Sequence, residues 1–300
     1  MERDFNMEFI PARTVLSGYS DGRSWFGINY NMNIYKGCCH GCIYCDSRSE
    51  CYRIDDFDVV RAKHNALALI ARDLKSKRRK GVVGTGAMSD PYNPFEQEHR
   101  LTRGALELIC THGFGTAIAT KSDLVTRDID VLSSICSHSP VLVKITITTA
   151  DDELCRKIEP HAPLPSKRFS AIRELASNGI FSGVLLMPVL PFIEDTSDNI
   201  ISIIRLASEA GAGFIFPAFG VTLRQNQREW YYSKLDEHFP GLRYKYAKQF
   251  GNAYECRSPR ARELWHMFKE ECDRIGILYN MQDIIDAYRQ PHSSTQLSLF

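Results

Sequence analysis

Short apolar runs alternate with longer amphipathic segments through the middle of the chain. Six runs predict strands, because they are short, apolar or alternating, and bounded by turn residues: 28–35, 82–87, 116–120, 141–148, 183–188 and 214–219. The segments between them predict helices, because apolar residues recur at intervals of three and four: 62–74, 101–110, 127–135, 166–177 and 196–210. A strand-then-helix rhythm therefore runs through six predicted strands and the five helices between them.

This rhythm predicts an α/β fold with parallel strands, since helical crossovers of this length connect strands that run in the same direction. A full eight-fold barrel would need two more units, so the expected architecture is a partial (β/α)6 barrel. The rhythm stops after residue 219, and a last helix is predicted at 259–274. We expect an N-terminal extension (1–27), the barrel (28–223), a C-terminal cap (224–289), and a linker with a tail (290–300).

Composition and charge narrow the class of protein. The 300 residues are 44% hydrophobic and 24% charged, as in an ordinary globular protein. The formal net charge of +1 excludes a global field that would attract nucleic acid or an anionic membrane, so any such binding must be local. The N-terminus lacks the apolar core of a secretory signal, and no apolar stretch is long enough to cross a membrane. We expect a cytoplasmic protein with no membrane contact.

The cysteines of the chain are unevenly distributed. Ten occur in total, and Cys38, Cys42 and Cys45 follow the first predicted strand at the spacing Cys-x3-Cys-x2-Cys. In a reducing compartment clustered cysteines indicate a metal rather than disulfides. Three thiolates in one short loop suit an iron–sulfur cluster with one iron left open. Structural zinc is the alternative, with its fourth ligand from Cys39, His40 or Cys51.

Several blocks of the sequence, in order, resemble one enzyme family. The cysteine spacing, with Tyr44 before the last cysteine, and its place after the first strand are similar to the radical S-adenosylmethionine (SAM) superfamily. The closest resemblance is to its spore photoproduct lyase-like branch, over roughly residues 28 to 280. The blocks that carry it are Tyr35–Cys38, Gly41–Cys45, Ser89–Tyr92, Thr120–Ser122, Arg127–Asp128, Ile145–Thr149 and Glu159–Pro163.

The resemblance implies a radical SAM barrel with a [4Fe-4S] cluster on Cys38, Cys42 and Cys45, whose open iron binds S-adenosyl-L-methionine. In the family, one-electron cleavage of SAM gives a 5'-deoxyadenosyl radical that abstracts a hydrogen atom from the substrate, and the protein positions and shields this chemistry. An electron donor such as flavodoxin or ferredoxin is implied as a partner.

The resemblance also implies cofactor-binding residues at the ends of the strands. Ser89 and Asp90 are expected near the SAM amino group, and Lys121 near its carboxylate. Thr146 is expected at the ribose, with Thr148 on the same face of the strand. Structural roles are the alternatives: Ser89 and Asp90 could simply form a turn, and Lys121 could be an exposed residue at the end of a strand. The two threonines could simply pack in the strand. Tyr44 completes the expected cofactor-binding set.

One departure from the photoproduct lyase pattern concerns the hydrogen donor. Those enzymes carry a cysteine three residues before the aspartate of the Ser-Asp-Pro-Tyr block, where this chain has Ala87. Strict thymine-dimer reversal is therefore not expected, and another donor or another reaction is. Cys51, Cys256 and Tyr254 are the donor candidates, although buried inert thiols are the default for scattered cysteines.

Positive charge and aromatic rings gather in residues 224–262, which contain nine basic and four acidic side chains. Aromatic residues there alternate with arginines and lysines, a combination that lets bases stack while the phosphates are neutralised. The segment predicts contact with nucleic acid, and a lid that packs its aromatics inside is the alternative.

The last five residues follow a polar linker and are Gln296, Leu297, Ser298, Leu299 and Phe300. They resemble the pentapeptide by which bacterial repair and replication proteins bind the sliding clamp. Extended peptides that order on binding can place such apolar anchors in a preformed pocket. The alternative is a tail that folds back on its own domain.

Together these features predict a radical SAM enzyme, a lyase or modifying enzyme that acts on DNA in repair or base modification and is recruited by the sliding clamp. Two alternatives stay open: a radical SAM enzyme that modifies RNA or a peptide, and a zinc-stabilised binding module without enzymatic activity.

Overall fold

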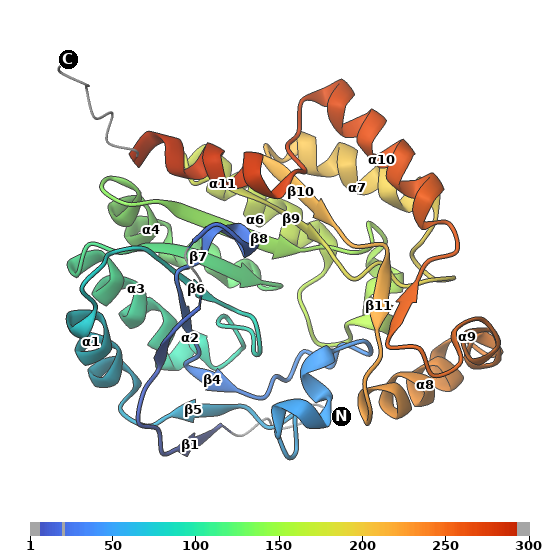
Figure 1. The fold of residues 1–300 in the computed structure, drawn as a ribbon, viewed down its shortest axis with the longest axis horizontal. Coiled ribbons are helices and arrows are strands. Elements are labelled where there is room, and N and C mark those ends of the chain that lie inside the picture. The colour runs from blue at the N-terminus through green and yellow to red at the C-terminus, as the bar shows by residue number, and fades with distance from the viewer. Residues whose placement is uncertain (1–6, 20–21, 293–300) are drawn as a thin grey trace.

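The fold is built around one large curved sheet with helices packed on its outer side (Figure 1). The structure, a computed structural model, describes residues 7–19 and 22–292. The main sheet has seven strands in the order β10-β9-β8-β7-β6-β3-β2. All neighbouring pairs from β3 to β10 are parallel, and only the edge strand β2 is antiparallel. Six parallel strands with outer helices confirm the expected partial (β/α)6 barrel.

The expected strands of the barrel are present, with ends shifted by a few residues. In chain order they are β3 (Tyr30–Met32), β6 (Val82–Thr85), β7 (Gly115–Thr120), β8 (Val141–Thr146), β9 (Ser182–Leu186) and β10 (Phe214–Pro217), whereas the edge strand β2 (Leu16–Gly18) lies in the expected N-terminal extension and was not predicted. The outer helices are α1 (Ala66–Ser76), α2 (Glu96–His99), α3 (Leu101–Thr111), α4 (Ile129–Cys136), α5 (Asp152–Ile158), α6 (Pro165–Ser177) and α7 (Ser197–Glu209).

The first expected strand is shorter than predicted. The segment 28–35 divides into β3 and β4 (Tyr35–Lys36), and β4 leaves the main sheet to pair with β5 (Arg61–Lys63). A small second sheet, β1-β5-β4, results, with β1 (Glu8–Ile10) at its edge. Ala62, expected at the start of a helix, therefore lies in β5 and pairs with Tyr35. The small sheet lies beside the loop that carries the cysteines and fixes where that loop begins.

The two faces of the main sheet are packed differently. Side chains on the outer face pack against the outer helices in the largest hydrophobic cluster, to which Ile118, Val143 and Val184 belong. The inner face forms a smaller cluster near the amino ends of the strands. That cluster consists of Phe26, Ile28, Val82, Ala117, Leu142, Leu185, Phe214, Ile284, Ile285 and Tyr288. The interior of the barrel is thus filled with side chains at one end.

A plug closes this amino-terminal end of the barrel. It combines the 3-10 helix η1 (Trp25–Gly27) with the C-terminal helix α11 (Met281–Arg289), two elements from opposite ends of the described chain. The Tyr288 hydroxyl donates a hydrogen bond to the Phe26 carbonyl (2.7 Å). We call these two elements the plug. The helix α11 was not expected from the sequence.

The region after β10 forms a lid and then returns to the barrel. The strands β11 (Gly220–Thr222) and β12 (Glu255–Arg257) pair with each other and enclose the helices α8 (Gln227–His238) and α9 (Leu242–Phe250). We call residues 220–257 the lid. Helix α10 (Ala261–Ile275), close to the predicted 259–274, packs beside α7 (Figure 1). Within the described ranges, no helix is both long and apolar enough to cross a bilayer.

Candidate functional site

A cavity of about 380 Å³ lies inside the barrel, at the carboxyl ends of the parallel strands. Several segments meet around it, among them the cysteine loop after β4, the loop after β6, the ends of β7 and β8, and Trp25 of the plug. Cys38, Cys42 and Cys45 all line it, as do Asp90 and Lys121. Residues that are far apart in the sequence, and that the sequence analysis had selected, therefore face one common space.

The cysteine loop is held by its backbone. Gly37 has φ +78°, and a Cβ there would lie 2.2 Å from the Val59 carbonyl oxygen, so only glycine fits. The Cys38 N–H donates to the Phe57 carbonyl (2.9 Å), and the Ile43 N–H to the Ile158 carbonyl (2.9 Å). The loop is thus anchored at both ends, which fixes the direction in which its cysteines point.

The three thiols suit a cluster better than a single ion. In the part of the chain that the structure describes, no three His, Cys, Asp or Glu side chains are placed to hold one metal ion. Zinc requires its ligands to converge on one point, whereas an iron–sulfur cube binds each cysteine at a different iron. Burial raises the pKa of each of the three thiols, so binding of the metal must displace their protons.

Asp90 connects the ends of two strands. It accepts hydrogen bonds from the Thr120 hydroxyl (2.6 Å), the Lys121 backbone N–H (2.7 Å) and the Tyr92 N–H (2.9 Å). Ser89 donates its hydroxyl to the Gly37 carbonyl at the start of the cysteine loop. Both residues line the cavity, but these contacts engage their side chains in holding the loops together.

A buried ion pair lies behind the cysteine loop. Arg168 and Glu159 are 0% and 1% exposed, and their nearest charged atoms are 2.5 Å apart. Glu159 also accepts the Tyr44 hydroxyl and lies 4.0 Å from Lys121 Nζ. Burial favours the neutral acid, but Arg168 and Lys121 outweigh it and lower the pKa of Glu159. The carboxylate therefore stays ionised and orients Tyr44 and Lys121.

Lys121 lies between this carboxylate and the cysteines. Burial opposes its charged form, yet Cys42 and Glu159 outweigh that cost and raise the pKa of Lys121 above its ordinary value. The ammonium is 5.5 Å from the centre of the Tyr44 ring, while Tyr44 itself does not line the cavity. Lys121 therefore presents a stable positive charge to the cavity.

The two threonines of the fourth barrel strand are separated by the structure. Thr146, the last residue of β8, lines the cavity. Thr148 lies beyond the strand, is buried, and does not line the cavity. The alternation of faces that predicted a shared position for Thr148 ends with the strand.

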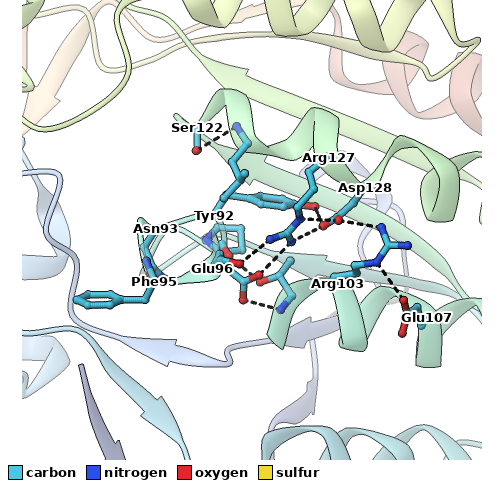
Figure 2. A network of polar contacts seen from close by, with 12 residues as sticks. Tyr92, Asn93, Phe95, Glu96, Arg103, Glu107, Ser122, Arg127 and Asp128 are labelled. Carbon is cyan, nitrogen blue, oxygen red and sulfur yellow. Dashed lines mark hydrogen bonds and ion pairs between the residues drawn. The ribbon is translucent and has the colours of Figure 1, made fainter. Parts of the chain in front are cut away.

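A polar network supports the outer side of the loop after β6 (Figure 2). Arg127 contacts the Glu96 carboxylate (3.2 Å) and that of Asp128 (2.8 Å), and the Tyr92 hydroxyl donates to Asp128 (3.1 Å). The Tyr35 hydroxyl donates to Glu96 and joins the network to β4. The Arg127–Asp128 block thus positions the loop that carries Asp90, and does not itself face the cavity of the cysteines.

The comparison with known families agrees with this geometry. The radical SAM superfamily matches residues 32–212, a stretch that contains the three cysteines, Asp90 and Lys121. The chain belongs to the radical SAM superfamily. It is therefore a radical SAM enzyme, and its cofactors are a [4Fe-4S] cluster and S-adenosyl-L-methionine. This result excludes the zinc-stabilised module without enzymatic activity.

Relatives of this radical SAM enzyme occur in bacteria and archaea. An uncharacterized protein of Mycobacterium tuberculosis (strain ATCC 25618 / H37Rv) is 29% identical over 228 residues, 74% of this chain and 67% of that protein. An uncharacterized protein of Methanocaldococcus jannaschii is 35% identical over 172 residues, 56% of this chain and 63% of that protein.

Solved structures show the same fold. A spore photoproduct lyase complexed with dinucleoside spore photoproduct has a TM-score of 0.66 and 16% identity, over 90% of this chain and 79% of that chain. A mutant of the lyase with bound AdoMet and the same dinucleoside also has a TM-score of 0.66, at 15% identity and with the same coverage. Sequence identities this low support a shared fold and no more.

The hydrogen-donor candidates of this radical SAM enzyme do not meet at the cavity. Ala87 lines it, at the position where the lyase pattern has cysteine. Cys51 and Tyr254 instead line a separate surface groove between the cysteine loop and the lid. Cys256 is fully buried in the lid. None of the three lines the cavity that contains Cys38, Cys42 and Cys45.

Part of the lid covers the cysteine loop. The Gln227 amide donates to the Tyr44 carbonyl (2.9 Å), and the Trp230 ring lies 4.0 Å from the Arg48 guanidinium. Tyr231 and Tyr246 are fully buried and hydrogen-bonded to each other (2.8 Å). These aromatic residues pack inside the protein, as expected if this segment is a lid that packs its aromatic side chains against the barrel.

Other residues of the lid remain exposed. Tyr244 and Tyr254 are 74% and 44% exposed. The exposed basic residues near them are Arg243, Lys245, Lys248 and Arg257. The surface available for nucleic acid is therefore smaller than the composition of 224–262 suggested.

Lys144 lines the cavity from the middle of β8 and was not predicted as a site residue from the sequence. Its side chain is 1% exposed, and burial alone lowers the pKa of Lys144 to about 7. The signal was available, because a single lysine interrupts the apolar run Val-Leu-Val-Lys-Ile-Thr at 141–146. A charged residue on a buried strand requires a ligand, a partner or a shifted pKa.

The shifted pKa predicts how Lys144→Met changes stability. Between pH 7 and its ordinary pKa of 10.5, Lys144 is protonated only in the unfolded chain, so wild-type stability rises with pH over this window. The stability of the variant lacks this pH dependence, and the variant should be more stable than wild type at pH 7. The difference in the free energy of unfolding between the two proteins should shrink by up to about 1.4 kcal/mol per pH unit as pH rises.

Denaturant unfolding of both proteins at several pH values measures this difference. A gap between variant and wild type that stays constant from pH 7 to 10 would show that Lys144 remains protonated in the folded protein.

Proposed function

We propose that this radical SAM enzyme acts on DNA, in repair or base modification. The observation that carries the proposal is the cavity itself, which joins three cysteines to Lys121 and Thr146 inside a fold shared with a lyase that binds a dinucleoside photoproduct. The exposed aromatic and basic residues on α9 supply a nearby surface for a nucleic-acid backbone.

In the proposed site, Cys38, Cys42 and Cys45 hold the cluster, which together with SAM supplies the radical that abstracts a hydrogen atom. Lys121 binds the SAM carboxylate, held in place by Glu159, and Thr146 contacts the ribose. Ser89 and Asp90 border the place of the SAM amino group, and Asp90 fixes the Lys121 backbone. Tyr44 does not contact SAM and instead helps to position Lys121, through its hydrogen bond to Glu159 and its ring beside the Lys121 ammonium.

The proposed reaction differs from strict photoproduct reversal, because Ala87 cannot return a hydrogen atom. Cys51, Cys256 and Tyr254 would each have to move to reach the cavity, so a donor from the substrate or another cavity residue fits the geometry better. We place the enzyme in the cytoplasm, with flavodoxin or ferredoxin as electron donor.

The decisive experiment compares DNA with other substrates. Reconstituted enzyme is incubated without oxygen with SAM, dithionite, and either ultraviolet-irradiated or undamaged DNA, and the digested nucleosides are analysed by mass spectrometry. We expect a nucleoside change that requires SAM and is absent in Cys45→Ala, which removes one cluster ligand. A change seen only with RNA or a peptide substrate would favour the second candidate function and contradict the DNA assignment.

The role of Lys121 predicts a loss of SAM affinity. Lys121→Ala removes charge-assisted hydrogen bonds of about 1.5–3 kcal/mol each, so SAM should bind at least roughly tenfold more weakly. Anaerobic calorimetry on reconstituted protein measures this affinity, with iron content as a check on the cluster. Lys75→Ala, an exposed lysine on α1, is the matched control. Full SAM affinity in an iron-replete Lys121→Ala protein would remove Lys121 from the site.

We also propose that residues 296–300 recruit the enzyme to a bacterial sliding clamp. Gln296, Leu297, Ser298, Leu299 and Phe300 lie outside the described residues, so the support is their sequence alone. Burial of two leucines and a phenylalanine contributes about 1.5–3 kcal/mol per side chain before ordering costs, which predicts weak, roughly micromolar binding of the free peptide.

Deletion of residues 296–300 should abolish binding to a purified bacterial clamp, measured by surface plasmon resonance, because it removes every anchor. Production of 5'-deoxyadenosine should persist, since the barrel and its cysteines are unchanged. If the deletion instead lowers the melting temperature or stops SAM cleavage, the pentapeptide packs on its own domain and clamp recruitment is wrong.

A further inference from the structure

The deep end of the cavity is formed by Lys144 and the plug. Lys144 is paired in register with Ala119 on one side and Gly183 on the other. These small neighbours leave lateral room for the long lysine stem on the inner face of the sheet. Lys144 lies two residues before Thr146 on the same strand, about 6–7 Å closer to the plug.

The amine of Lys144 has few partners in the protein. Its hydrogen bond to the Ala117 carbonyl is long, at 3.5 Å, and the ring centre of Phe26 lies 4.9 Å away. Among the described residues, no carboxylate forms an ion pair with it. The group carries three N–H donors as an ammonium and two as a neutral amine, so in either form Lys144 retains hydrogen-bonding capacity toward the cavity that it lines.

Aromatic and amide side chains accompany the amine. Trp25, on the plug, lines the same cavity and is 37% exposed. Trp25 and Phe26 have φ of +36° and +54°, a left-handed backbone that non-glycine residues adopt only where packing enforces it. Here α11 enforces it, through Tyr288 and through Met281 Sδ, which accepts the Phe26 N–H (3.0 Å). The amide of Asn31 faces the cavity from β3.

We propose that the deep end of this cavity binds a nucleobase extruded from DNA, with Lys144 donating a hydrogen bond to a carbonyl oxygen of the base and Trp25 contacting its ring. This inference rests on the proposed DNA function and names the part of the substrate that enters the barrel. A base inside a duplex cannot reach an interior site, so it must leave the stack first, and flipped bases are read by hydrogen bonds and aromatic or apolar contacts.

A phosphate suits this position less well than a base. The cavity walls near Lys144 include Ile28, Ala119 and Leu185, which offer no side-chain donor. A buried anion would have one cation and few further hydrogen bonds, an arrangement in which desolvation outweighs attraction. A carbonyl oxygen is neutral and requires only one donor, while the apolar walls fit the faces of a base.

The test compares two single-stranded oligonucleotides of equal length and charge, oligothymidylate and a fully abasic strand. Anisotropy titrations use the reconstituted holoenzyme without oxygen. Wild type should prefer the thymine strand, and Lys144→Met should lose roughly three- to tenfold of that preference, the value of one hydrogen bond. Binding of the abasic strand should stay unchanged, because phosphate contacts lie outside the barrel. Lys75→Met is the matched control.

A pH series shows whether Lys144 donates a hydrogen bond to the base or only shapes the cavity by packing. The ammonium form donates more strongly than the amine, so the thymine preference of wild type should be larger at pH 6 than at pH 8, and this pH dependence should be missing in Lys144→Met.

Three results would overturn the inference. If Lys144→Met prefers the thymine strand as strongly as wild type does, Lys144 does not contact the base. If Lys144→Met also binds SAM three- to tenfold more weakly than wild type, Lys144 contacts the cofactor and not the base. If wild type binds neither strand, the DNA function itself fails, and the nucleoside analysis with RNA then shows whether another substrate replaces it.

Discussion

The buried contact between Glu159 and Arg168 connects nearly every part of the site. Besides Glu159, Arg168 donates to the Thr146 carbonyl (2.9 Å) and the Pro163 carbonyl (2.6 Å), so the pair ties the end of β8 to the loop after α5. Through Tyr44 it also holds the cysteine loop. Buried ion pairs add little net stability, but removal of one partner typically costs about 3–5 kcal/mol. The pair therefore acts mainly by defining one arrangement of the loops.

The framework of the barrel could be predicted from the sequence because its signals are local. Parallel strands covered on both faces read as short apolar runs, and the amphipathic helices between them show a clear period. The cysteine spacing and the Ser-Asp-Pro-Tyr block also lie within a few residues, so they were recognisable. What these residues do was less predictable, since the contacts of Asp90 with Thr120 and Lys121 cross between strands.

The missed features depend on contacts between distant residues. Phe26 and Met281 are in contact although most of the chain separates them, and nothing near Phe26 signals its left-handed backbone. The sequence left two interpretations of the lid open for a related reason: Trp230 covers Arg48 of the cysteine loop, and Tyr231 packs on Tyr246. An aromatic and basic composition looks the same whether its side chains face solvent or an arginine of another segment.

The plug lies outside the stretch that matches the superfamily. That match covers residues 32–212, whereas the plug comes from Trp25–Gly27 and Met281–Arg289. Generation of the radical and closure of the barrel floor are therefore encoded in separate stretches of the gene. Mutations that reshape the floor therefore need not alter the cysteine loop or the Glu159–Arg168 pair. Given the base-binding role proposed for the floor, this separation allows relatives, or directed evolution, to change what the enzyme accepts while its radical chemistry is retained.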